Sequence, residues 1–175
     1  MSLLRRILMI VCLVATSPAG AAQYSSDAHG LVADLPKRLT ICLAEEPAPN
    51  HGFVVPLAPA TCDDPQAGPR IVFWVAYNVV DEYRTAADMR TDICGNAHAL
   101  PSRLRVAGAR LLTCALPPDR GFERTVYFGV RPRAGEHVSR WTEITITAVC
   151  LATMMPRCRA LAAEIAGHVR ARKRN

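Results

Sequence analysis

The sequence predicts an α+β fold, in which a mostly antiparallel sheet of about five strands carries a mid-chain helix and a C-terminal helix. Two observations indicate this class: several segments alternate apolar with polar residues, as half-buried strands do, and two segments have helical spacing. A third observation is that six cysteines follow an export signal, so up to three disulfides staple the fold.

The first 22 residues are typical of a cleaved signal peptide. Arg5 and Arg6 precede an apolar run from Ile7 to Ala15, and small residues follow up to position 22. The run is too short to span a bilayer and no comparable run follows it, so we expect no transmembrane segment after signal removal. The mature chain, residues 23–175, is then a single domain that folds in the periplasm or after secretion, where thiols oxidise.

The six cysteines of the mature chain are expected to pair with one another, because their number is even and the compartment is oxidising. Six cysteines allow about 15 pairings. Pairing of neighbours would close three local loops, each contributing about 2–4 kcal/mol of stability. Without a Cys-x-x-Cys motif, the sequence favours neither a thioredoxin-like site nor a zinc ribbon. The cysteines are Cys42, Cys62, Cys94, Cys114, Cys150 and Cys158.

The first half of the mature chain predicts two strands around a proline-rich segment. Residues 23–36 are polar and mixed, which is typical of a lightly ordered lead-in, and residues 38–44 have the composition of a short strand. Residues 45–70 contain six prolines, so we expect a long irregular excursion held by Cys42 and Cys62, with a short edge strand at residues 53–55 at most. Residues 71–80 are apolar at both parities, which predicts a central strand covered on both faces.

The second half predicts a helix, further strands and a final helix. Helical spacing over residues 82–93 is followed by Gly95, a residue typical of a position just past a helix end. Two β-like halves meet at Gly108 within residues 103–116, and residues 117–121 form a turn. Alternation over residues 125–131 and 141–150 predicts antiparallel strands with one buried face. The last helix opens near Pro156, and a Cys150–Cys158 bridge would pin it to the preceding strand.

The positive charge of the chain is concentrated at its C-terminus. Of 21 basic residues, two lie in the signal and four among the last six positions, which leaves 15 basic and 15 acidic residues in the body. A nucleic-acid binder is expected to carry its basic residues on a folded face, so we expect no nucleic-acid partner. We interpret the tail as a frayed, solvated helix end, with weak contact to anionic membrane surfaces as the alternative.

No motif for catalysis, metal or cofactor binding is specific in this sequence, so we predict no catalytic residue, no metal site and no cofactor. His98 and His137 are interpreted as solvated loop residues, although a Glu136–His137 pair has the chemistry of an acid–base couple. Asp63 and Asp64 are interpreted as a turn before proline rather than as paired catalytic carboxylates.

The function that these observations favour is an exported small binding protein with a protein partner. Its specific form is an inhibitor or immunity protein that occludes an envelope- or cell-wall-degrading enzyme, because stiff cysteine-anchored loops bind at low entropic cost. The candidate contact residues are Asn50, His51 and Phe53 in the proline-rich loop, and Trp141 on the polar face of the last strand. The alternatives are a small secreted hydrolase and a subunit of an envelope or secreted assembly.

Overall fold

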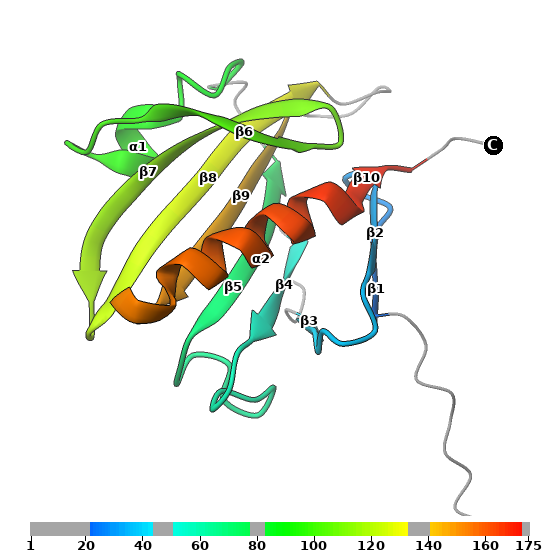
Figure 1. Ribbon diagram of the computed structural model, residues 1–175. Helices are drawn as coiled ribbons and strands as arrows, with labels where there is room; N and C mark the ends of the chain where they lie inside the picture. Colours follow the sequence, from blue (N-terminus) through cyan, green and yellow to red (C-terminus); the bar gives the residue numbers. More distant parts are fainter. Residues whose placement is uncertain (1–21, 44–50, 78–82, 133–140, 173–175) are drawn as a thin grey trace, which may run out of the picture.

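The computed structural model describes residues 22–43, 51–77, 83–132 and 141–172, and these form two antiparallel sheets and two α-helices (Figure 1). The α+β class is therefore confirmed. The large sheet has seven strands in the order β3-β4-β5-β9-β8-β7-β6, and the small sheet has three in the order β1-β2-β10. The strands are β1 (Ala22–Ser26), β2 (Leu31–Leu35), β3 (Cys42–Leu43), β4 (His51–Pro56), β5 (Arg70–Tyr77), β6 (Leu100–Val106), β7 (Ala109–Asp119), β8 (Phe122–Pro132), β9 (Trp141–Cys150) and β10 (Val169–Ala171).

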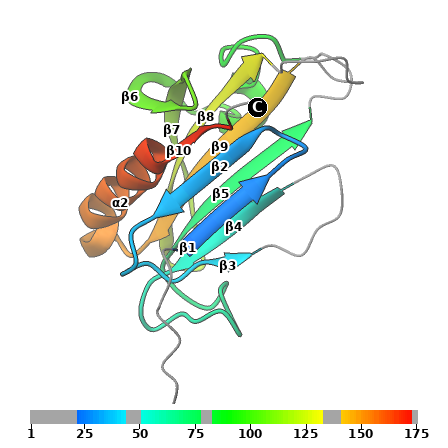
Figure 2. The same cartoon turned by 90° about the vertical axis from the view of Figure 1, so that its right-hand side faces the viewer.

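One face of the large sheet, here called the inner face, is covered by helix α2 (Met155–His168) and by the small sheet. Figure 2 shows the small sheet in front of β4 and β5, with α2 beside it. In β9, the predicted alternation is confirmed, because Thr142, Ile144 and Ile146 are buried on the inner face while their neighbours are half-buried. Most large buried side chains of the chain belong to this layer, so it is the main core.

The opposite, outer face is covered differently along the sheet. Met89 and Cys94 pack there on Cys114, Val126 and Phe128, in a second and smaller cluster. This cluster lies over β7 and β8 only, so the strand β5 is not covered on both faces by the described elements, contrary to the sequence prediction. Its burial instead alternates, as expected for a strand with one core face.

The expected three disulfides are confirmed, and each joins neighbouring cysteines, a connectivity that the sequence left open. Cys42 is bonded to Cys62, Cys94 to Cys114, and Cys150 to Cys158. The last bond joins the end of β9 to the first turn of α2, and the second joins helix α1 (Arg90–Cys94) to β7.

The helix predicted at residues 82–93 is much shorter in the structure, where α1 begins at Arg90. The preceding residues form turns instead, because backbone bonds there span three residues, such as Asp88 N–H to Thr85 O. The Asp88 carboxylate accepts the backbone N–H groups of Arg84 and Thr85, and these bonds lower its pKa. Gly95, with φ of 57°, ends α1 as predicted.

The lead-in predicted as lightly ordered is a β-hairpin. Residues 31–35 bury alternate side chains, and β1 pairs with β2 over its whole length. The turn of this hairpin needs Gly30, whose φ is +59°. Its carbonyl oxygen accepts the backbone N–H of Arg172 and a guanidinium N–H of Arg131, so the turn is tied to the C-terminus and to β8.

The C-terminal segment is likewise structural, which corrects the interpretation of it as a frayed helix end. Val169 is buried, and β10 adds a third strand to the small sheet by pairing with β2. Arg170 forms an ion pair with Asp34, and Arg172 forms one with Asp27. Residues 173–175 lie outside the described residues.

Candidate binding loop and an adjoining groove

The contact residues predicted in the proline-rich segment are not brought to an exposed loop tip. Asn50 lies outside the described residues, and His51, of which only the backbone is described, begins β4. Phe53 is wrong as a contact residue, because its side chain is fully buried. It stacks on Phe73 at 4.9 Å between ring centroids and contacts Tyr24 at 5.1 Å. The many prolines of this segment predicted an irregular loop, whereas β4 lies in the interior of the sheet between β3 and β5.

Trp141 lies where its pattern indicated, at the start of β9 on the outer face, and it is half-buried. Trp74 lies on the same face of the neighbouring strand β5, opposite Gly52 of β4. A Cβ atom at Gly52 would lie 2.5 Å from Cε3 of Trp74, so the absence of a side chain there leaves room for the indole. The outer face therefore carries two tryptophans at the β5–β9 part of the sheet.

The second half of the proline-rich segment, residues 57–69, is the projecting loop of the described chain. It joins β4 to β5 at the end of the sheet opposite to α1 (Figure 1). Most of its side chains between positions 58 and 67 are exposed, including the adjacent carboxylates Asp63 and Asp64. We call residues 57–69 the binding loop hereafter.

The binding loop is fixed in place at several points despite its exposure. The Cys42–Cys62 disulfide ties its middle to β3. Leu57 N–H bonds to the Pro69 carbonyl oxygen at 2.8 Å, which closes the base of the loop, and Ala60 N–H bonds back to Leu57 O at 2.9 Å. Such internal bonds reduce the conformational freedom that a loop loses when a partner binds.

Arg70 secures the returning arm of the binding loop. Its Nη1 donates to the carbonyl oxygens of Gln66 and Gly68, at 2.9 and 3.0 Å. Partial burial lowers the pKa of this guanidinium, while the nearby Asp119 carboxylate opposes the shift. Gly68 packs closely enough on Ala60 that a Cβ there would lie 3.1 Å from the Ala60 Cβ, so the two arms of the loop are in contact.

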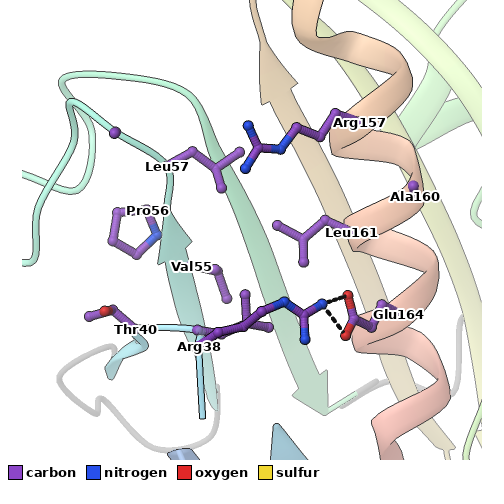
Figure 3. A pocket seen from close by; sticks show the side chains of 11 residues that line it. Arg38, Thr40, Val55, Pro56, Leu57, Arg157, Ala160, Leu161 and Glu164 are labelled. Carbon is purple, nitrogen blue, oxygen red and sulfur yellow. Dashed lines mark hydrogen bonds and ion pairs between the residues drawn. The ribbon is translucent and has the colours of Figure 1, made fainter. Parts of the chain in front are cut away.

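A groove of about 360 Å³ adjoins the binding loop, between α2 and the end of β4 (Figure 3). Its floor is apolar and includes Val55, Leu57 and Leu161. At one end Arg38 bridges to α2, where its Nη2 donates to both carboxylate oxygens of Glu164. At the other end the Arg157 side chain extends across the groove toward Leu57.

The sequence offered little sign of this groove. Arg38 and Glu164 are 126 positions apart. They meet only because α2 packs against the segment that follows β2. Arg157 stands in the first turn of a helix, where a positive charge is unfavourable by roughly 0.3–1 kcal/mol. This unfavourable position of a positive charge is the feature of the sequence by which Arg157 could have been singled out.

The residues considered for hydrolysis are not assembled into one site. Asp63 and Asp64 are exposed in the binding loop, whereas the exposed His98 follows α1, a helix at the opposite end of the large sheet (Figure 1). His98 lines a hollow of about 260 Å³ together with Arg90. His137 lies outside the described residues. Within the described ranges, no three His, Cys, Asp or Glu side chains are grouped as a metal site would require.

No helix of the described residues is long and apolar enough to cross a membrane. No protein-family model matches the chain, and no curated protein matches it in sequence. Among solved structures, the solution structure of cyanobacterial PsbP (CyanoP) from Synechocystis sp. PCC 6803 is similar with a TM-score of 0.49 and 14% identity, over 90% of this chain and 95% of that one. This likeness is too distant to carry an argument about function.

Proposed function

We propose that this chain is an exported binding protein that presents the binding loop to a protein partner. In its specific form it is an inhibitor or immunity protein, which occludes the active site of an enzyme that degrades the envelope or cell wall. The observation that carries the proposal is the combination of exposure and rigidity in residues 57–69. A loop of that kind is expected to bind with a small loss of conformational entropy.

Two observations indicate that the protein is exported, and export supports the proposal. The N-terminal segment has the features of a signal peptide, and the six remaining cysteines form three disulfides, which persist in oxidising compartments. A periplasmic or secreted location is the one in which an inhibitor of envelope-degrading enzymes meets its target.

The exposed carboxylates of the binding loop give the proposal a charge preference. Asp63 and Asp64 are both exposed and place two adjacent negative charges in the middle of the loop. Rim charges of this kind steer association with a surface of opposite sign. The partner is therefore expected to present basic residues around the site that the loop occupies.

A second candidate is a subunit of an envelope or secreted assembly that uses the outer face. Trp74 and Trp141 favour it, because aromatic side chains are enriched at protein interfaces. The two candidates place the contact surface on different parts of the molecule, so experiments on the bound state separate them.

The test begins with the mature protein as bait in an envelope extract, followed by purification of the retained protein and titration of its hydrolytic activity. Asn in place of Asp63 and Asp64 preserves side-chain shape while removing both charges. We expect the D63N/D64N protein to bind roughly 5- to 20-fold more weakly, or about 1–2 kcal/mol, through slower association. Glu123→Gln, a matched loss of an exposed carboxylate on β8, is expected to bind as the natural protein does.

Two outcomes would contradict the proposal. One is unchanged affinity of the D63N/D64N protein, which would remove the binding loop from the interface. The other is a retained protein whose activity on its own substrate is unaffected by saturating amounts of this chain, which would leave binding but exclude inhibition.

A further inference from the structure

The groove between α2 and the end of β4 has the properties of a ligand site, and it adjoins the binding loop, whose Leu57 and Ala58 help to line it. Its volume of about 360 Å³ lies within the usual range for small-molecule sites. The floor is formed by side chains from two layers, with Leu161 of α2 facing Val55 of β4 (Figure 3). Branched apolar side chains such as these suit contact with an aliphatic chain.

The charged side chains of the groove differ in how they are engaged. Arg38 and Glu164 neutralise one another at one end, and the Arg38 side chain is 62% exposed. Arg157 makes no ion pair or hydrogen bond with the described part of the chain, yet it extends over the apolar floor (Figure 3). The groove thus offers one uncompensated positive charge beside an apolar surface.

We propose that this groove binds a small aliphatic monocarboxylate, with its carboxylate on Arg157 and its alkyl part between Leu57 and Leu161. A single anionic head matches the single uncompensated guanidinium, which suits bidentate recognition of a carboxylate. The ligand chemistry has two natural sources: a free fatty acid, and the C-terminal aliphatic residue of a peptide. This inference does not depend on the proposed function of the binding loop.

The test is calorimetric titration of the mature protein with two probes, octanoate and acetyl-Ala-Leu with a free carboxylate. Each has a neutral partner, octanamide and acetyl-Ala-Leu amide, which keeps the apolar part and removes the charge. Binding of at least one acid, and at least tenfold weaker binding of its amide, is the expected result. The acid that binds more tightly identifies the source.

Substitutions of charged residues on α2 test whether the acid binds in the groove. Arg157→Gln is expected to weaken binding of the acid tenfold or more without changing affinity for the amide. Arg159→Gln, two positions along the same helix and outside the groove lining, is the matched control and should leave binding unchanged. Glu164→Gln frees Arg38 for the ligand, so it should tighten binding of the acid several-fold.

A substitution that fills the groove tests the location of the binding site independently of charge. Ala160 is an exposed residue of α2 that lines the groove, so Ala160→Phe adds a ring there without disturbing the core and should abolish binding of either acid. The proposal is overturned if neither acid binds at millimolar concentration. It is equally overturned if Arg157→Gln and Ala160→Phe bind as the natural protein does.

Discussion

At the scale of single residues, the inward or outward direction of a side chain decided which candidates can contact a partner. Phe53 and Trp141 were both chosen from the sequence as aromatic residues in polar surroundings. Phe53 points to the inner face and is fully buried, whereas Trp141 points to the outer face and is half-buried. Successive residues of a strand face opposite sides, so a shift of one position separates a core residue from a surface residue.

Phe53→Ala is therefore expected to destabilise the fold rather than to weaken binding specifically. Loss of a fully buried phenylalanine ring costs about 3–5 kcal/mol, a large part of the stability of an ordinary domain. Leu43→Ala is the matched control, because Leu43 lies opposite Phe53 in the register but is 64% exposed. Its free energy of unfolding in urea should change by about 0.5 kcal/mol or less. Equal effects of the two substitutions would show that Phe53 is not in the core.

Two glycines provide a contrasting pair of tests. At Gly52 a Cβ would lie 2.3 Å from the Phe73 carbonyl oxygen, whereas at Gly167 no atom lies within 4 Å. Gly52→Ala is expected to lower the free energy of unfolding by roughly 1–3 kcal/mol through overpacking. Gly167→Ala, within α2, should raise it by roughly 0.5–1 kcal/mol through helix propensity. Denaturant titration checks both, and a stabilised Gly52→Ala protein would contradict the described contact with Trp74.

At the scale of elements, strands with strong alternation were predicted well and short paired strands were missed. Residues 141–150 predict β9 because the even positions from Ile144 to Cys150 are all apolar. Strands β1, β2 and β10 are short, and β1 and β10 are each stabilised by pairing with β2 and by the core beneath them rather than by their own composition. Local propensity does not report such partners, and for β10 the partner strand is also distant in sequence.

The C-terminal strand gives the clearest test at this scale. A chain that ends at Val169 loses most of β10, the Arg172 N–H bond to Gly30 and two ion pairs. We expect its melting temperature to fall by roughly 2–4 °C, equivalent to about 1 kcal/mol, mainly from lost strand pairing because exposed ion pairs contribute little. A chain that ends at Arg172 keeps all these contacts and should melt as the full mature protein does. Identical melting of the two truncated chains would contradict a structural role for β10.

At the scale of the whole molecule, the class, the presence of three disulfides and the final helix could be predicted, and the functional surfaces could not. Each disulfide joins two segments that lie no more than 20 positions apart in the sequence and that the fold brings side by side. The groove needs α2, β4 and Arg38 together, and only the tertiary packing supplies that arrangement. The exposed tip of the proline-rich segment was expected at residues 50–53 and lies at residues 58–67 instead, because prolines near both ends of β4 masked an interior strand.

We infer that residues 57–69 form the surface that meets the protein partner. Hydroxyl-radical footprinting, read by mass spectrometry on the free protein and on its complex with the retained partner, tests it most directly. If the binding loop is the interface, its side chains become less reactive toward hydroxyl radicals in the complex, while Trp74 and Trp141 react as they do in the free protein. Protection of the two tryptophans with an unchanged loop would contradict the account and assign the interface to the outer face of the sheet.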